Sequence, residues 1–421
     1  MSISEIDQAH IWHPLTQHKT SSAPMPIVKA EGAMLYAEDG TTYIDGIASW
    51  YTAMYGHCNP YIIEQVTAQM KTLDQIVFTG FTHQPATTLA QKVLDILPEN
   101  QQKIFFNDNG STAVEAGIKM ALQYHHNKGS KRNTLIAFEN GFHGDTFGAM
   151  SVSDLSVYNG PFEDYFLNVK RIPAPTEENL AGVMQLLQSI IEKHACAGFV
   201  YEPLVQGAAG MHMYDASGLE SILKLCKAND IVTVADEVMT GFGKTGKHFA
   251  SLYLETYPDI ICLSKALTAG LVPMSLTTCT QEIYDAFLDD TVAKGFFHAH
   301  TYSANPIACA AAIAGIDLLT SEDIQSQIQH IHKRHSAFAK AIKTHPKAIN
   351  IRVKGVIFAL ELHTEMERYG SLRNALFKHF MDRGICLRPL GNTIYILPPF
   401  VITDVQLDQI YKAIKEALET F

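Results

Sequence analysis

The sequence lacks the charge, the leader and the apolar runs that mark several classes of protein. Its 43 acidic residues outnumber its 32 basic ones, for a net charge of -11, and only the short stretch NKGSKRN at 127–133 is basic. A nucleic-acid partner is therefore not expected. The N-terminus has no basic segment followed by an apolar one, and no apolar run is long enough to span a membrane. Neither a signal peptide nor a membrane partner is expected.

The sequence also lacks the motifs of disulfide-bonded and metal-binding proteins. Its seven cysteines show no CxxC spacing, and their number is odd. They are Cys58, Cys196, Cys226, Cys262, Cys279, Cys309 and Cys386. This pattern favours free thiols in a reducing compartment, so we expect a cytoplasmic protein. The 19 histidines form no HExxH or similar pattern, and no metal is expected.

The middle of the chain alternates short apolar stretches with amphipathic ones. Four of the apolar stretches lie at 133–140, 197–203, 231–237 and 259–265, and a helical pattern such as 217–230 separates two of them. Continuous apolar strands are buried on both faces, which is typical of a mainly parallel sheet covered by helices. The sequence therefore predicts an α/β fold.

The two ends of the chain have a different character. The first 55 residues are irregular apart from an expected hairpin around Asp39 and Gly40. After about 310, a long helical stretch is followed by short strands and a closing helix, which is typical of a smaller α+β unit. We expect an N-terminal segment (1–55) that packs with a small C-terminal domain (323–421), and a large domain between them (56–322).

Two strand ends carry charged residues where open α/β sheets bind ligands. Lys265 follows an apolar strand, and a buried ammonium is costly unless it is paired or used. Either its side chain reaches out to water, or it forms a Schiff base with a carbonyl compound. Asp236 closes the preceding strand, 29 residues earlier. It either caps the next helix or pairs with a protonated ring nitrogen such as that of pyridoxal 5'-phosphate.

Other loops could complete such a site. Gly110 and Ser111 open a helix, where they form either a phosphate cup or an ordinary N-cap. Phe142, in a glycine-rich loop, either stacks on a planar cofactor or packs in the core, and the adjacent His143 is read as an ordinary loop histidine. Arg388 is either a bidentate partner for a substrate carboxylate or part of a structural salt bridge.

In this order, the motifs resemble those of the fold-type I pyridoxal-phosphate enzymes, specifically the class III aminotransferases, over essentially the whole chain. Four stretches are similar to the members of that family that act in biotin biosynthesis. They are HIWHPLTQH at 10–18, SWYTAMYGH at 49–57, GFHGDTFGAMSVS at 141–153 and LRPLGNTIYILPP at 387–399. The resemblance implies 8-amino-7-oxononanoate as amino acceptor, with S-adenosylmethionine or lysine as donor.

The resemblance also implies a role for individual residues. Lys265 would hold the cofactor and move the proton, Asp236 would pair with the ring nitrogen, and Arg388 would bind the carboxylate of the keto substrate. The implied cofactor-binding residues are Gly110, Ser111, Phe142, Asp236, Lys265, His300 and Thr301. The implied substrate-binding residues are Trp50, Phe142, Lys265, Ala299 and Arg388. The loop at 299–301 would reach into a partner subunit, which implies a homodimer with shared active sites.

The chain departs from the pattern of that family at several positions. The departing residues are Leu15, Phe142, Lys244, His300 and Leu390. Because arginine and lysine are not equivalent at a bidentate site, these departures leave the donor open. Another class III aminotransferase acting on ω-amino acids or diamines is the nearest alternative, and Glu202 keeps it open. A pyridoxal-phosphate racemase or decarboxylase, and a non-catalytic protein on this fold, are the others.

Overall fold

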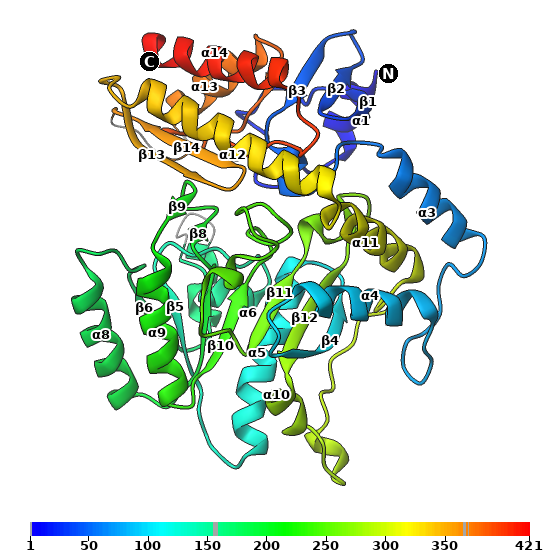
Figure 1. Cartoon of the computed structure of the whole chain (residues 1–421), viewed down its shortest axis with the longest axis vertical. Coiled ribbons are helices and arrows are strands. Elements are labelled where there is room, and N and C mark those ends of the chain that lie inside the picture. The colour runs from blue at the N-terminus through cyan, green and yellow to red at the C-terminus, as the bar shows by residue number, and fades with distance from the viewer. Residues whose placement is uncertain (1, 155–158, 365–367, 369) are drawn as a thin grey trace.

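The computed structural model describes residues 2–154, 159–364, 368 and 370–421. Its largest element is a seven-stranded sheet, in the lower part of Figure 1. In spatial order the strands are β4 (Gln101–Asn107), β12 (Ser275–Thr280), β11 (Ile260–Leu263), β10 (Val232–Asp236), β7 (Cys196–Tyr201), β5 (Thr134–Phe138) and β6 (Val169–Ile172). Only β12 runs against its neighbours. The prediction of a mainly parallel α/β sheet is confirmed.

Helices cover both faces of this sheet, and the strands are apolar throughout for that reason. In β5, Leu135 and Ala137 belong to the cluster built around α5 (Gly110–Asn127). Ile136 and Phe138 belong to the other cluster, with α8 (Leu180–Lys193) and α9 (Ala216–Ala228). Successive side chains of a strand point to opposite faces, so each face has its own core. The helices α4 (Gln84–Ile96), α6 (Phe147–Val152), α10 (Gln281–Asp285) and α11 (Pro306–Leu319) complete this part.

A second sheet joins the two ends of the chain. Its strands are β1 (Ile27–Glu31), β2 (Met34–Ala37), β3 (Thr42–Asp45) and β15 (Ile385–Cys386). The expected hairpin is confirmed, because β2 and β3 are antiparallel and the chain turns at Asp39 and Gly40. Ile385 of β15 pairs with Ile44 in parallel. This pairing supports the expected packing of the N-terminal segment on the C-terminal region, and Figure 1 shows both termini on that side of the molecule. The three domain boundaries stay a prediction.

The rest of the C-terminal region is a three-stranded antiparallel sheet with helices. Its strands are β13 (Ala348–Lys354), β14 (Ile357–Leu362) and β16 (Thr393–Ile396). Its helices are α12 (Glu322–Ile342), α13 (Ser371–Met381) and α14 (Asp404–Thr420). In Figure 1, α12 lies across the front of β13 and β14, which it contacts. The remaining elements are α1 (Ile3–His10), α3 (Pro60–Met70), β8 (Val205–Gln206) and β9 (His212–Met213).

One short element was not predicted from the sequence. Helix α2 (Ala48–Tyr51) is a left-handed turn, with φ angles of +48°, +46°, +69° and +71° in succession. Residues with a Cβ rarely adopt this conformation. None of these residues is glycine, asparagine or aspartate, so no local signal indicates the turn.

The expectations of no membrane-spanning helix, no disulfide and no metal site can be examined in the described residues. No helix in the described part is long and apolar enough to cross a membrane. All seven cysteines are free thiols. Among the described residues, no group of three or more histidines, cysteines, aspartates or glutamates could hold a metal ion.

Candidate active site

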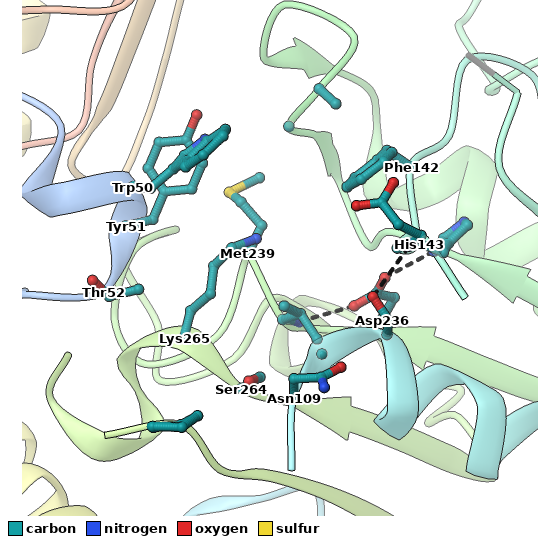
Figure 2. A pocket seen from close by; sticks show the side chains of 18 of the residues that line it. Trp50, Tyr51, Thr52, Asn109, Phe142, His143, Asp236, Met239, Ser264 and Lys265 are labelled. Atoms are coloured by element: carbon teal, nitrogen blue, oxygen red, sulfur yellow. Dashed lines mark hydrogen bonds and ion pairs between the residues drawn. The ribbon is translucent and has the colours of Figure 1, made fainter. Parts of the chain in front are cut away.

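A cavity of about 580 Å³ lies beyond the ends of β10 and β11. Six of the predicted site residues line it, namely Trp50, Gly110, Ser111, Phe142, Asp236 and Lys265. Ala299, His300, Thr301 and Arg388 are not among its lining residues. Figure 2 shows Trp50 and Tyr51 on one side of the Lys265 amine, with Asp236 and His143 on the other. The structure therefore brings together residues that are more than 200 positions apart in the chain.

Asp236, at the end of β10, is held by two donors and is only 4% exposed. Its Oδ1 accepts from the backbone N–H of Val238 at 3.0 Å, and its Oδ2 lies 2.8 Å from Nδ1 of His143. The prediction that this carboxylate caps the following segment and the prediction that it faces a ligand are therefore compatible. Because an ionised carboxylate only accepts hydrogen bonds, the cavity side of Asp236 suits a protonated nitrogen.

The sequence predicts an ordinary loop histidine at His143, and the place of this residue beside Asp236 is not predicted from it. Its side chain is buried, and its Nε2 has no hydrogen-bond partner in the part of the chain that the structure describes. The two residues are 93 positions apart, so no local spacing connects them. Only its position directly after Phe142, in the predicted cofactor loop, could have pointed to His143.

Lys265 follows β11 and begins a short 3₁₀ turn, with its own φ at +49°. Its Nζ lies 5.6 Å from the centre of the Tyr51 ring. Burial lowers the pKa of the Lys265 amine, and the charges of Asp236 and Glu202 act in the opposite direction. A lysine with a lowered pKa has a larger neutral fraction, which is the form that attacks a carbonyl or accepts a proton.

The start of α5 forms a cup suited to an anion. Asn109 is the N-cap residue, because its side chain accepts from Thr112 N at 3.1 Å, so the alternative of Ser111 as N-cap is wrong. The first N–H groups of a helix have no intrahelical acceptor and favour a phosphate. Ser111 Oγ accepts from the N–H of Asp145 at 3.2 Å. A Cβ on Gly144, whose φ is +129°, would lie 2.1 Å from Ser111 Oγ, so only glycine fits there.

Glu202 connects the Phe142 loop to Gly207, the residue after β8, and is 4% exposed. Its Oε1 accepts from Phe142 N at 3.0 Å, and its Oε2 accepts from Gly207 N at 2.8 Å. Burial raises the pKa of Glu202 to about 7, helped by the charge of Asp236 and opposed by His143 and the two N–H donors. This carboxyl group therefore titrates near neutral pH.

The left-handed turn forms the opposite wall. The Trp50 side chain is 45% exposed, and the Arg388 guanidinium lies 5.5 Å from the centre of its ring. Tyr51 is buried, and its hydroxyl donates to the Tyr395 hydroxyl at 2.9 Å. Arg388 makes no ion pair among the described residues, so the alternative of a structural salt bridge is not supported there.

The predicted loop at 299–301 lies outside the cavity. Ala299 and Thr301 are exposed. The Thr301 carbonyl accepts from Gln75 Nε2 at 3.1 Å, and Nδ1 of His300 lies 3.4 Å from Asp108 Oδ2. Asp108 itself lines the cavity, so the loop is tied to its rim. The roles of this loop toward a partner subunit stay a prediction.

Further residues of the site were missed or only noted as departures. Leu15 and Leu390 line the cavity, as does Arg368, whose Nη2 donates to the Ala208 carbonyl at 2.6 Å. Lys244 does not line it. Its side chain is fully buried, its Nζ has no hydrogen-bond partner among the described residues, and burial holds its pKa well below the usual range.

The lining residues fit pyridoxal 5'-phosphate. The helix start at Gly110 and Ser111, where Gly144 leaves room, suits the phosphate. The Asp236 carboxylate suits the ring nitrogen, and the Lys265 amine lies in the same cavity for the covalent linkage. Each part of the cofactor thus has a chemically matched group.

Comparison with known proteins agrees with this fit. The model of the aminotransferase class-III family matches residues 15–418. An adenosylmethionine-8-amino-7-oxononanoate aminotransferase of Synechococcus elongatus is 40% identical, over 97% of this chain and 98% of its own length. The crystal structure of the enzyme of that name from Methanocaldococcus jannaschii is 33% identical, covers 98% of both chains and has a TM-score of 0.92. An amine transaminase from an uncultivated Pseudomonas species, in its PLP-bound form, is 26% identical over 97% of this chain and 98% of its own, with a TM-score of 0.90.

Proposed function

Because this chain belongs to the class-III aminotransferase family, whose cofactor is pyridoxal 5'-phosphate, we propose that it transfers an amino group to 8-amino-7-oxononanoate, giving the 7,8-diaminononanoate of biotin biosynthesis. Relatives named for this acceptor match over nearly the full length of the chain. The single observation that carries the proposal is the meeting of Lys265 and Asp236 in one cavity walled by Trp50.

The proposed chemistry divides between the cofactor and the protein. When bound, pyridoxal 5'-phosphate supplies an electron-accepting ring that stabilises charge on the substrate carbon. Asp236 holds the positive charge of the ring nitrogen, since it can only accept, and His143 fixes the direction of its Oδ2. Lys265 Nζ takes up and returns the proton of the reacting carbon, and its lowered pKa enlarges the neutral fraction that can accept this proton.

Recognition of the acceptor is assigned to the opposite wall. Trp50, Leu15, Leu271 and Leu390 line the cavity there and suit a long aliphatic chain. Arg388, stacked on Trp50, is the proposed partner of the substrate carboxylate, because a guanidinium binds a carboxylate through two parallel hydrogen bonds. The donor is S-adenosylmethionine or lysine.

We also propose a homodimer with shared active sites. The exposed loop at 299–301, which is tied to the cavity rim through Asp108, is the segment proposed to reach the partner subunit. Exposed apolar side chains of the N-terminal segment, such as Trp12 at 89%, support burial against a second copy. Light scattering of the purified protein tests this, with the mass of a dimer expected and that of a monomer contradicting it.

A second candidate is a class-III aminotransferase that acts on ω-amino acids or diamines. Three observations favour it. Glu202 faces the cavity with a pKa of about 7, and Arg368 lines the same cavity as a second cation. The structural similarity to an amine transaminase is also high.

A half-reaction followed by absorbance decides between the candidates. The yellow holoenzyme is mixed separately with S-adenosylmethionine, lysine and a simple ω-amine, and the visible absorbance is recorded. 8-Amino-7-oxononanoate is then added to each bleached sample. Bleaching by S-adenosylmethionine or lysine, with recovery on adding the keto acid, is the expected result and names the donor. Bleaching by the ω-amine alone, with no recovery, would contradict the proposed acceptor and favour the second candidate.

A further inference from the structure

The left-handed turn at 48–51 is a strained segment that supplies Trp50 and Tyr51 to the cavity wall. Four consecutive residues that carry a Cβ have φ angles between +46° and +71°. The turn closes through two backbone hydrogen bonds of 2.9 Å, from Tyr51 N to Ile47 O and from Thr52 N to Ala48 O. Residues with a Cβ favour the right-handed form, so the surrounding structure must over-determine this one.

Asp45 is the group that holds the start of this turn. It ends β3 and is 1% exposed. Its Oδ1 accepts from Ile47 N at 3.2 Å, and its Oδ2 accepts from Ser49 N at 2.8 Å and from Ser49 Oγ at 3.2 Å. Both carboxylate oxygens are therefore directed at the start of the turn, one at Ile47, the residue before it, and the other at Ser49, its second residue.

His57 completes the arrangement from the other end of the segment. Its Nε2 lies 2.8 Å from Asp45 Oδ2. Its backbone is fixed by a reciprocal pair of hydrogen bonds with Gly32, at 2.8 and 3.1 Å. Asp45 is fixed in turn by β15, where its partner is Cys386. The carboxylate thus stands on a sheet strand and the imidazole on an isolated β-bridge, and the strained turn lies between them in the chain.

The turn determines what the cavity presents to a ligand. It places Trp50 on the cavity wall under Arg388 and Tyr51 beside the Lys265 amine, at 5.6 Å from ring centre to Nζ. A right-handed turn with the same sequence would send consecutive side chains in other directions, because the Cβ positions depend on the hand of the helix. The contacts of both rings therefore depend on keeping the turn left-handed.

We propose that Asp45 and His57 are positioning residues that hold residues 48–51 in the left-handed turn and so place Trp50 and Tyr51 in the cavity. Neither residue lines the cavity. They act through the turn, and the part of the test that uses the keto acid rests on the proposed function.

The test compares two aspartates of the same hairpin. Asp45→Asn removes an acceptor of Ser49 N, while the matched control Asp39→Asn changes an exposed aspartate that accepts from Thr41 N at 2.9 Å. Both are made in a Trp12→Phe parent, which leaves Trp50 as the only tryptophan, since the chain has two. The holoenzymes are compared by Trp50 emission, acrylamide quenching, visible cofactor absorbance, and kcat and KM for the keto acid.

The expected result is specific to Asp45→Asn. Trp50 emission shifts and becomes more strongly quenched, and KM for 8-amino-7-oxononanoate rises by about tenfold or more, while the cofactor absorbance persists. Asp39→Asn matches the parent in all four readouts. A Trp50 signal and a KM in Asp45→Asn equal to those of the control would overturn the proposal.

Two further variants, and a readout that needs no keto acid, keep the test decisive. If Asp45→Asn does not fold, His57→Asn and Ser49→Ala each remove one bond of the set, and unchanged Trp50 quenching in both overturns the proposal equally. If no variant and no parent acts on the keto acid, the proposed function fails, and Trp50 quenching still decides the role of Asp45.

Discussion

The two walls of the cavity are built in different ways. The wall formed by Asp236, Ser111 and Lys265 stands on the ends of strands and the start of a long helix. Asp236 is buried, and both Asp236 and Ser111 are hydrogen-bonded. The wall formed by Trp50 and Leu390 comes from a strained turn and from the C-terminal region, and Trp50 is 45% exposed. The first wall suits a cofactor that stays in place, and the second suits a substrate that comes and goes.

The difference between the walls indicates where substrate selectivity can change while the cofactor-binding residues stay the same. The departures Leu15 and Leu390 lie in the cavity lining, away from the strand ends. Substitutions on the strand-end wall should therefore lower the rate of the chemical step, and substitutions on the turn wall should change KM. Three variants test this division, beginning with the largest expected effect, and a fourth tests the ionisation of Glu202.

The substitution Lys265→Ala should abolish nearly all activity, because it removes the amine that reacts. We expect kcat/KM to fall by at least about 10⁴-fold, because the amine serves both as covalent partner and as proton carrier. Stopped-flow absorbance with the donor measures it. Lys247→Ala removes an exposed lysine from the loop before Tyr253 and serves as the control. Bleaching by the donor at the parent rate in Lys265→Ala would contradict the assignment.

The substitution Asp236→Asn tests the electrostatic part of the strand-end wall. The amide keeps the shape and the bond from Val238 N but loses the charge opposite the ring nitrogen. We expect kcat to fall about 10²- to 10³-fold with little change in KM, as for other preorganised charges in a dry site. Steady-state kinetics measures both constants. Asp39→Asn, far from the cavity, is the matched control, and equal kinetics in the two variants would remove Asp236 from the mechanism.

The strand-end wall was largely predictable from the sequence. Asp236 and Lys265 close consecutive apolar stretches, and parallel strands bring their carboxyl ends to one edge of the sheet. Ser111 follows a strand and opens a helix, so its position near the same edge follows from the alternation of elements. Local residue types and strand ends were enough, because the backbone direction places the side chains.

The turn wall was not predictable, because long-range contacts make it. The stretch IASWYTA has no glycine to favour positive φ, and its conformation depends on Asp45, which is held by β15 from the other end of the chain. The pairing of His143 with Asp236 likewise spans 93 positions. The burial of Lys244 depends on the β13–β14 hairpin, where Gly355 leaves room for the Lys244 carbonyl. No pattern within a window of ordinary length contains such information.

The substitution Trp50→Leu tests whether the turn wall affects KM and not kcat. Leucine keeps the wall apolar but loses the aromatic face on which Arg388 stacks. We expect KM for the keto acid to rise about tenfold with kcat within a few-fold of the parent, since one stacked aromatic group contributes on the order of 1 kcal/mol. The donor half-reaction, measured separately, should change little. Trp12→Phe is the control for loss of a tryptophan, and a fall in kcat without a rise in KM would contradict the division between the walls.

The last prediction concerns protein stability at Glu202, which accepts hydrogen bonds from Phe142 N and Gly207 N. Its pKa of about 7 in the folded protein exceeds that of an ordinary glutamate, because it is buried. A group whose pKa rises on folding stabilises the protein below its unfolded pKa, and that contribution is lost as the pH rises through the folded value. The wild-type free energy of unfolding should therefore fall between about pH 4.5 and pH 7 by about 3 kcal/mol from this group. Glu202→Gln, which cannot ionise, should flatten that part of the curve in urea denaturation at pH 5 and pH 8. An identical pH dependence in the two proteins would mean that Glu202 is ionised throughout, held by the N–H groups of Phe142 and Gly207.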